Sequence, residues 1–349
     1  MADAVGDARP KGNTPNGSQD ANAYVLRVGR EAMACEFEVR LNAGQYVYGT
    51  ELALETLDLV NRLEEQLSFF REDSDICRIN RTAAAGPVEV EPRLFALLEL
   101  ASQLHHATDG AFDLTATPLW EAWGFARREG SVPDERQIEE ALELVGGDLV
   151  ELDSAKRTVW FRKPGVRLNL GGIGKGYALD CCAEELSDSG VADFLIHGGR
   201  SSVLSCGCRR GGRDESAETS DSGWEVGIAH PLRPDRRLGR IRLANQALST
   251  SGSWAQSFLH EGRRYAHIVD PRSGRPAEGI LSATAIAPTA AEADALSTAF
   301  YVLGPERTAE YCDARAGVAA VFACGVRHHG GMEIQTAGLE DGELYDRAV

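Results

Sequence analysis

The chain has 349 residues, of which 43% are hydrophobic and 7% aromatic, so it is long and apolar enough to fold around one large core or two ordinary ones. Its formal net charge of -17 excludes general nucleic-acid binding, because phosphate backbones are held by clustered Lys and Arg. An anionic ligand would need a local cationic site or a bound metal ion. The eight cysteines follow no compact disulfide framework, which predicts mostly buried thiols in a reducing compartment.

The N-terminal stretch is polar and contains no apolar signal segment, and no later stretch reaches the roughly 18 apolar residues of a membrane span. We expect a disordered lead-in at 1–22, one folded domain at 23–335 and a C-terminal tail at 336–349. On this sequence we expect a cytoplasmic location, since no export signal is seen. Residues 206–223 are rich in glycine, serine and charge, which predicts a surface insertion.

The first half of the chain predicts a strand pair followed by helices. The strand pair is expected over 24–41. Apolar residues at helical spacing predict a helix over 50–67, with Thr50 as its N-cap. A second helix fits 92–107, with a proline in its first turn, and a third fits 134–145.

The second half predicts more strands. A hairpin turning at 163–165 leads into a glycine turn and a helix that ends near Gly190. One further helix fits 290–303. Strands are expected at 193–199, 224–229, 238–243, 264–270, 280–287 and 317–323. Because helices and strands mix without regular βαβ alternation, an α+β class is favoured over a doubly wound one.

The glycine turn is the first segment with chemical interest. In LNLGGIGKGYALD, Leu168 to Asp180, four glycines in six residues follow a strand-like run and precede a helix. Such a turn can present backbone N–H groups and the positive end of a helix dipole to a phosphate. The spacing matches neither the dinucleotide nor the P-loop signature, so an ordinary strand-to-helix connection is the alternative. Lys175 favours phosphate binding, because a cation in this turn has little packing purpose.

A histidine and an aspartate mark the predicted strand end in YAHIVDPRSGRP, residues 265–276. His267 can accept a proton, and Asp270 can contact a ligand if the turn at Pro271 swings it round. On these residues alone, a polar strand end at a tight turn is the simpler interpretation.

Asp294 and Thr298 lie one helical turn apart in TAAEADALSTAFYVLG, away from the apolar stripe of the predicted helix. A carboxylate and a hydroxyl so placed can both give oxygen to Mg²⁺, which prefers hard oxygen ligands and bridges substrate phosphates. The alternative is a solvated helix face.

An aromatic cluster follows the turn at Asp109 and Gly110 in HHATDGAFDLTATPLWEAWGF, residues 105–125. Its rings either stack on a planar ligand or form part of the core. The cluster consists of Phe112, Trp120, Trp123 and Phe125.

Taken in order, these segments resemble the ApbE family, the FAD:protein FMN transferases. Family members carry TDGAFDxT…WGF, DLGGIAKGYAxD, a GGD or GGN turn, TSGxY…HIIDPxTGxP and ADALATAxFVLG. The corresponding segments here are 108–125, 169–180, 198–200, 250–276 and 293–304. LSFFREDSDICRIN also resembles the family pattern, so the resemblance covers nearly the whole predicted domain.

The resemblance implies an α+β fold of mixed, T-fold-like sheets flanked by helices. It also implies Mg²⁺-dependent transfer of FMN from FAD to a Ser or Thr hydroxyl of an acceptor flavoprotein, with release of AMP. Two alternatives keep the same pocket. One is a non-enzymatic FAD-binding or flavin-delivery protein, and the other is a Mg²⁺-dependent FAD diphosphatase that yields FMN and AMP.

The resemblance also implies roles for individual residues. His267 would assist deprotonation of the acceptor hydroxyl and, with Asp294, would be catalytic. Asp294, Thr298 and the carbonyl of Gly172 would bind the metal. The expected FAD contacts are Phe70, Asp109, Gly110, Ala111, Phe112, Gly171, Gly172, Lys175, Gly199, Arg200, Ser251, His267 and Asp270.

Three residues depart from the family pattern. Asn169 replaces an aspartate before the first glycine pair, which removes one charge near the metal. Arg200 stands where the family has Asp or Asn, and a cation there either pairs with phosphate or displaces a flavin contact. Cys35 replaces a threonine near the start of the domain.

Overall fold

The computed structural model describes residues 24–209, 223–233, 235–253, 256–325 and 331–347. The predicted lead-in and most of the predicted insertion, 210–222, lie outside these residues. Within the described ranges, no helix combines the length and the apolar composition that crossing a membrane requires.

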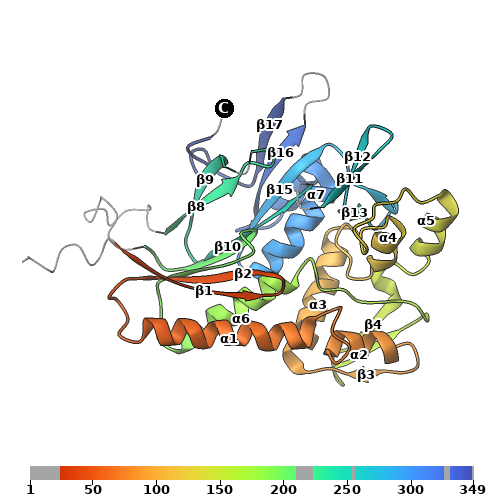
Figure 1. Ribbon diagram of the computed structural model, residues 1–349, viewed down its shortest axis with the longest axis horizontal. Coiled ribbons are helices and arrows are strands. Elements are labelled where there is room, and N and C mark those ends of the chain that lie inside the picture. Colours follow the sequence, from red (N-terminus) through yellow and green to blue (C-terminus); the bar gives the residue numbers. More distant parts are fainter. Residues whose placement is uncertain (1–23, 210–222, 234, 254–255, 326–330, 348–349) are drawn as a thin grey trace, which may run out of the picture.

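An eight-stranded antiparallel sheet forms the centre of the fold (Figure 1). The strand order is β1-β2-β6-β7-β10-β15-β16-β17. Nearly every residue of β15 is buried, because both faces of this central strand are covered, whereas the edge strand β1 alternates between half-buried and exposed positions. The strands are β1 (Val25–Ala32), β2 (Cys35–Asn42), β6 (Phe194–Gly198), β7 (Ser202–Cys206), β10 (Gln246–Gly252), β15 (Ile280–Ala287), β16 (Ala319–Gly325) and β17 (Met332–Ala337).

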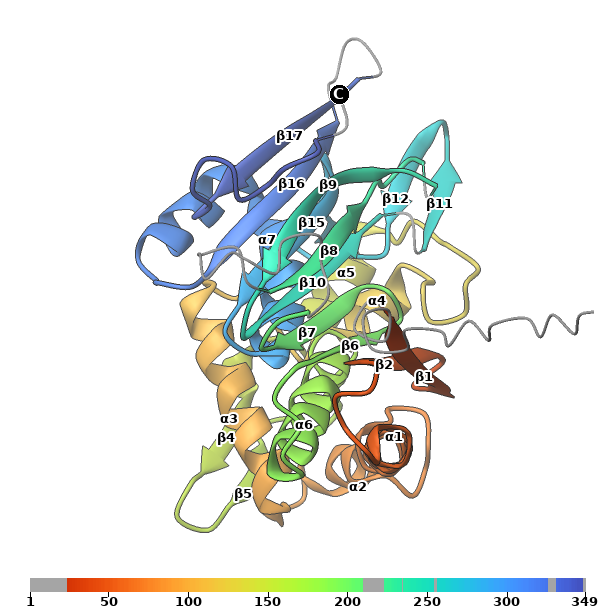
Figure 2. The same ribbon diagram turned by 90° about the vertical axis from the view of Figure 1, so that its left-hand side faces the viewer.

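Three helices cover one face of this sheet, as Figures 1 and 2 show: α1 (Gly49–Leu67), α6 (Gly174–Asp188) and α7 (Ala290–Asp313). Helix α6 packs between α1 and α7, and α7 packs on β10 and β15. The apolar stripe that predicts α1 is buried, since Leu57, Val60 and their neighbours on that face contribute to the main core. The layering brings the N-terminal ends of α6 and α7 together against the sheet.

The other face of the sheet carries a smaller core. The hairpin of β8 (Trp224–Ala229) and β9 (Arg237–Leu243) covers the face formed by the strands from β6 to β16. Trp224 and Leu243 are buried beneath this hairpin. Leu344, within the predicted C-terminal tail, packs into the same cluster.

The remaining elements flank the sheet. Figure 2 shows the β11–β12 hairpin projecting from the molecule beside α4 and α5. The helices are α2 (Asp75–Thr82), α3 (Pro92–Ala107), α4 (Thr117–Ala122), α5 (Glu135–Leu142) and the 3₁₀ turn Gly147–Leu149. The strands are β3 (Val88–Glu89), β4 (Val150–Asp153), β5 (Thr158–Phe161), β11 (Ser257–His260), β12 (Arg263–Ala266), β13 (Val269–Asp270) and β14 (Arg275–Pro276).

The α+β class is confirmed, and so are the helix at 92–107 and the strand at 280–287. Two local predictions are wrong. Tyr48, not Thr50, is the N-cap of α1, and no side chain caps it. The expected hairpin at 163–165 does not form, because β5 pairs with the preceding β4 instead.

The strand-like run before the glycine turn is held by side chains rather than by a neighbouring strand. The Asn80 amide accepts a hydrogen bond from the Leu168 N–H (2.8 Å) and donates one to the Leu168 carbonyl (2.9 Å). The N–H of Asn169 donates to the Leu114 carbonyl over 2.9 Å. These bonds satisfy the backbone groups that a strand partner would otherwise take, which explains why no hairpin is needed.

Three further predictions need correction. The helix predicted to end at 303 bends at Gly304, where φ is 75°, and resumes to Asp313. The strand predicted at 264–270 divides into β12 and β13. The eight cysteines form no disulfide, but only Cys181, Cys182 and Cys312 are buried, and the others are half-buried.

Candidate active site

The start of α7 is fixed by residues outside that helix. The Asp180 carboxylate, on α6, accepts hydrogen bonds from the N–H groups of Ala290 (2.7 Å) and Ala291 (2.8 Å). The Thr289 hydroxyl accepts one from the N–H of Glu292 (3.2 Å). The first N–H groups of α7 therefore have partners, and α6 and α7 are joined at this end.

Gly176 allows the two helices to touch through their backbones. A Cβ atom at this position would lie 2.0 Å from the Ala290 carbonyl oxygen, which no side chain can do. The close approach places the glycine turn directly beside Asp294, one turn into α7. The turn thus packs on a second helix as well as beginning α6.

The Asp294 carboxylate is the centre of a buried hydrogen-bond cluster and is only 4% exposed. Its Oδ1 accepts from the hydroxyls of Ser202 (3.2 Å) and Ser249 (3.0 Å), and its Oδ2 accepts from the N–H of Gly176 (3.1 Å). Lys175 Nζ lies 3.3 Å from both oxygens. The alternative of a solvated helix face is therefore wrong for Asp294, and Lys175 compensates its charge.

A second group of hydroxyls continues from this cluster. Ser251, two residues after Ser249 on β10, points to the same face of the sheet and contacts Ser297 (2.8 Å) and Thr298 (3.2 Å), both measured between hydroxyl oxygens. A Cβ on Gly172 would lie 3.6 Å from the Thr298 hydroxyl oxygen. The structure thus brings the glycine turn, Asp294 and Thr298 together.

These residues fit a Mg²⁺ ion in donor type. They offer a buried carboxylate, a hydroxyl and, at Gly172, a backbone carbonyl, and Mg²⁺ prefers such oxygen ligands. In the part of the chain that the structure describes, no group of three His, Cys, Asp or Glu side chains gathers as a ligand set. A metal bound here would complete its coordination with water or substrate oxygens, which is the usual way in which Mg²⁺ is held.

His267 lies apart from Asp294, and no contact joins the two among the described residues. Its Nδ1 is 3.0 Å from the carbonyl oxygen of Gln256, which also accepts the backbone N–H of His267 (3.1 Å). Because a carbonyl only accepts, Nδ1 carries the hydrogen in the neutral ring and Nε2 is the basic nitrogen. Burial lowers the pKa of His267 below its ordinary value, against the smaller opposite effect of the Gln256 hydrogen bond.

Two turns with predicted FAD contacts lie side by side. Asp109, with φ of 56°, accepts a hydrogen bond from Arg307 of α7 (2.8 Å), and Gly110 packs against the side chain of Arg272. Asp270 accepts hydrogen bonds from the Arg272 guanidinium at 2.8 and 2.9 Å. Asp270 is thus engaged within its own turn, as the simpler interpretation of that segment expects.

The two residues after Gly110 face the interior. Ala111 and Phe112 are buried, and the Phe112 ring approaches Gly172.

The second glycine turn adjoins Cys35. Gly199 and Arg200 have φ of 60° and 59°, and the Arg200 side chain is exposed. A Cβ on Gly199 would lie 3.1 Å from the sulfur of Cys35. Phe70, one of the expected FAD contacts, is 75% exposed and meets the neighbouring Phe69 ring edge-on. Gly171 donates its N–H to the Asn169 side chain (2.9 Å), which shapes the first glycine turn.

The aromatic cluster is largely core. Trp123 and Phe125 are 2% and 1% exposed and belong to a small separate core with α5. Ring binding is therefore not available to these two side chains as they stand. The Trp123 indole N–H donates to the Gly274 carbonyl (2.8 Å), which fixes the turn after Asp270.

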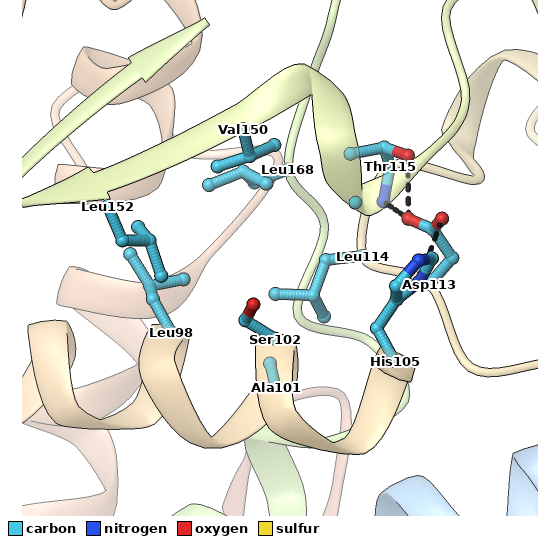
Figure 3. A pocket seen from close by; sticks show the side chains of 11 residues that line it. Leu98, Ala101, Ser102, His105, Asp113, Leu114, Thr115, Val150, Leu152 and Leu168 are labelled. Atoms are coloured by element: carbon cyan, nitrogen blue, oxygen red, sulfur yellow. Dashed lines mark hydrogen bonds and ion pairs between the residues drawn. The ribbon is translucent and has the colours of Figure 1, made fainter. Parts of the chain in front are cut away.

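A cavity of about 40 Å³ lies beside α3 (Figure 3), and Asp294 does not line it. Its polar end is formed by His105 and Asp113, whose Nδ1 and Oδ2 atoms are 3.2 Å apart, and Thr115 donates its N–H and hydroxyl to Asp113 (Figure 3). Asp113 raises the pKa of His105. These bonds anchor the turn that carries Phe112, since His105 also contacts the Phe112 carbonyl (3.1 Å).

The sequence pattern does not single out Ser202 or Ser249, and it includes Asp180 only as the last residue of the segment that resembles the family motif, although all three place Asp294 or its helix. The sequence does contain a signal for Ser249. It lies two residues before Ser251 on one strand, and alternate positions of a strand share a face. Ser202 lies far from Asp294 in the chain, and Asp180 lies far from the start of α7. The packing of β7 and α6 brings Ser202 to Asp294 and Asp180 to Ala290.

Comparisons with known proteins show which family and which fold the chain resembles. Residues 33–322 match the ApbE family. A FAD:protein FMN transferase of Klebsiella pneumoniae is 30% identical over 280 residues, which cover 79% of this chain and 83% of the relative. The crystal structure of the ApbE protein of Thermotoga maritima is similar with a TM-score of 0.76 at 30% identity, over 90% of this chain and 97% of that one. The flavinyl transferase ApbE of Pseudomonas stutzeri, in its apo form, also gives a TM-score of 0.76, at 28% identity over 91% and 98%.

Proposed function

The chain belongs to the ApbE family of flavin transferases, and we propose that it is a Mg²⁺-dependent FAD:protein FMN transferase. FAD would be the donor, and a Ser or Thr hydroxyl of an acceptor flavoprotein would receive the FMN moiety with release of AMP. The observation that carries the proposal is the convergence of Lys175, Asp294 and Thr298 on the glycine turn.

This convergence suits a dinucleotide diphosphate. Asp294 and Thr298 offer oxygen ligands, and a Mg²⁺ ion bound to them would neutralise charge on the diphosphate as the phosphoanhydride bond breaks. Lys175 supplies a cation at the same place, which a chain of net charge -17 needs for an anionic ligand. The N-terminal end of α6 adds its positive dipole end.

His267 supports the transfer step. Its Nδ1 is committed to the Gln256 carbonyl, so Nε2 is the nitrogen that can accept the proton of the acceptor hydroxyl. The lowered pKa keeps the ring neutral, and hence basic, at neutral pH. The attacking oxygen would then bond to the FMN phosphorus, and AMP would leave.

The proposal is tested by incubating the purified protein with FAD and Mg²⁺, with and without a flavin-acceptor domain, and measuring AMP and covalent flavin fluorescence of the acceptor in a denaturing gel. AMP together with a fluorescent acceptor is the expected result. AMP without acceptor labelling would indicate the FAD diphosphatase instead. FAD binding without AMP in either mixture would indicate a flavin-binding or flavin-delivery protein.

A further inference from the structure

The hydrogen bonds of Asp294 leave little room for another ligand. An ionised carboxylate has about four lone-pair sites, two on each oxygen. Ser202 and Ser249 each have one hydroxyl hydrogen. Their hydroxyl oxygens lie 3.0 Å apart, but the charged carboxylate is a stronger acceptor than a hydroxyl, so both donate to Oδ1. Oδ2 receives the Gly176 N–H. Among the described residues, these three donors and Lys175 are the hydrogen-bond partners of the carboxylate.

Lys175 is the cation among these partners. Its Nζ is equally distant, at 3.3 Å, from the two oxygens of Asp294, which places the ammonium in front of the carboxylate. The lysine side chain is 25% exposed and that of Asp294 is 6% exposed, so the ammonium lies on the solvent side of the pair. The two serines hold Asp294 from the sheet, where they are 0% and 1% exposed.

We propose that the Lys175 ammonium holds the place of the divalent cation on Asp294, and that the metal binds by displacing it. This inference rests on the proposed function, which assigns a metal to this carboxylate. Two cations in front of one carboxylate repel each other strongly in a buried setting. Lys175 is therefore an affinity-setting residue for the metal.

The displacement has a consequence for the order of binding. Lys175 follows the glycine turn directly, so an ammonium released from Asp294 stays near that turn. An anionic diphosphate at the turn would stabilise the released ammonium, whereas without one the ammonium returns to Asp294. We therefore expect weak metal binding by the protein alone.

The test measures Mn²⁺ binding without FAD, by titration followed with electron paramagnetic resonance of the free ion. Lys175→Met removes the charge and keeps the length of the side chain, and it should bind Mn²⁺ about tenfold more tightly or more than the wild type. Lys175→Arg keeps the charge and should stay near the wild-type affinity. Lys163→Met, at an exposed lysine, gives the same change in net charge and should leave the affinity unchanged.

A second measurement uses the wild-type protein and needs no variant. Mn²⁺ or Mg²⁺ should increase the labelling of Lys175 by an amine-reactive reagent, measured by peptide mass spectrometry, with no change at Lys163. Equal or weaker Mn²⁺ binding by Lys175→Met than by the wild type, including no binding by either, would overturn the proposal, as would unchanged labelling. Neither readout depends on flavin transfer, so a failed transferase assay with tighter binding by Lys175→Met would overturn the proposed function alone.

Discussion

Asp180 of α6 and Ala290 of α7 are joined by a 2.7 Å hydrogen bond from the Ala290 N–H to the carboxylate, which ties the starts of the two site-forming segments together. Asp180→Ala would leave this N–H and that of Ala291 without their partner. We expect a loss of about 1–2 kcal/mol in the free energy of unfolding, measured by urea denaturation. Asp188→Ala, at the exposed end of α6, is the control. An equal loss in both variants would contradict the capping role.

The same carboxylate predicts a dependence of stability on pH. Burial raises the pKa of Asp180 from 3.8 to about 6, against the two N–H groups that favour its charged form. A pKa that is higher in the folded state gives a stabilising contribution that is complete below 3.8 and is lost as the pH rises through about 6. The unfolding free energy of the wild type should therefore fall relative to that of Asp180→Asn over this interval.

Asp294→Asn tests the centre of the hydroxyl cluster. The amide cannot balance the Lys175 charge and is a poor metal ligand, so Mn²⁺ binding should be lost and FMN transfer should fall by about 10²-fold or more. FAD binding should persist in part, because the glycine turn and Lys175 remain. Asp188→Asn serves as the matched control. Undiminished transfer by Asp294→Asn would remove the metal from this residue.

His267→Ala should bind FAD and Mn²⁺ as the wild type does and transfer FMN about 10²- to 10⁴-fold more slowly. Because burial lowers the pKa of His267, the wild-type rate should fall with acid only below the ordinary histidine value of 6.5. That acid limb should be absent from the pH profile of the variant. His260→Ala, at an exposed position of the nearby strand β11, should match the wild type. A wild-type acid limb above 6.5 would contradict the neutral, buried imidazole.

The sequence predicts those parts of the fold whose signals are local. Helix α3 has a proline in its first turn, and the buried strand β15 is apolar except for Ser282 and Thr284, and both elements are found at their predicted bounds. The hairpin predicted at 163–165 does not form, because the N–H and the carbonyl of Leu168 bond instead to the Asn80 side chain. Asn80 lies far from Leu168 in the sequence, so no local pattern predicts this contact.

The candidate site likewise contains some residues that the sequence predicts and others that it does not. Asp294 and Thr298 are visible as a pair one helical turn apart, and the glycine turn is visible as composition. The contribution of Ser202 is not visible in the sequence, because β7 meets α7 only in the folded protein. The tautomer of His267 likewise depends on a backbone carbonyl, which carries no residue-specific signal.

Arg200→Asn tests the residue that departs from the family at the second glycine turn. With φ of 59°, Arg200 is in the left-handed region, where asparagine is favoured, so the variant should gain a few tenths to about 1 kcal/mol in unfolding free energy. Its FAD affinity should fall by up to about tenfold, less at high salt, because an exposed cation is lost. Arg233→Asn is the exposed control. Greater stability with unchanged FAD affinity would show that Arg200 makes no phosphate contact.

Gly176→Ala and Gly174→Ala form a matched pair at the start of α6. A Cβ at Gly176 would lie 2.0 Å from the Ala290 carbonyl oxygen, so α6 and α7 would have to separate, and Asp294 would move from the Gly176 N–H. We expect a loss of about 3 kcal/mol or more in unfolding free energy, together with loss of FMN transfer. A Cβ at Gly174 meets Leu170 at an ordinary 3.7 Å, and alanine is favoured over glycine in helices by about 0.5–1 kcal/mol, so Gly174→Ala should be at least as stable as the wild type. Thermal unfolding of both variants decides the point: if Gly176→Ala unfolds at the wild-type temperature, the backbone contact between the helices does not position Asp294.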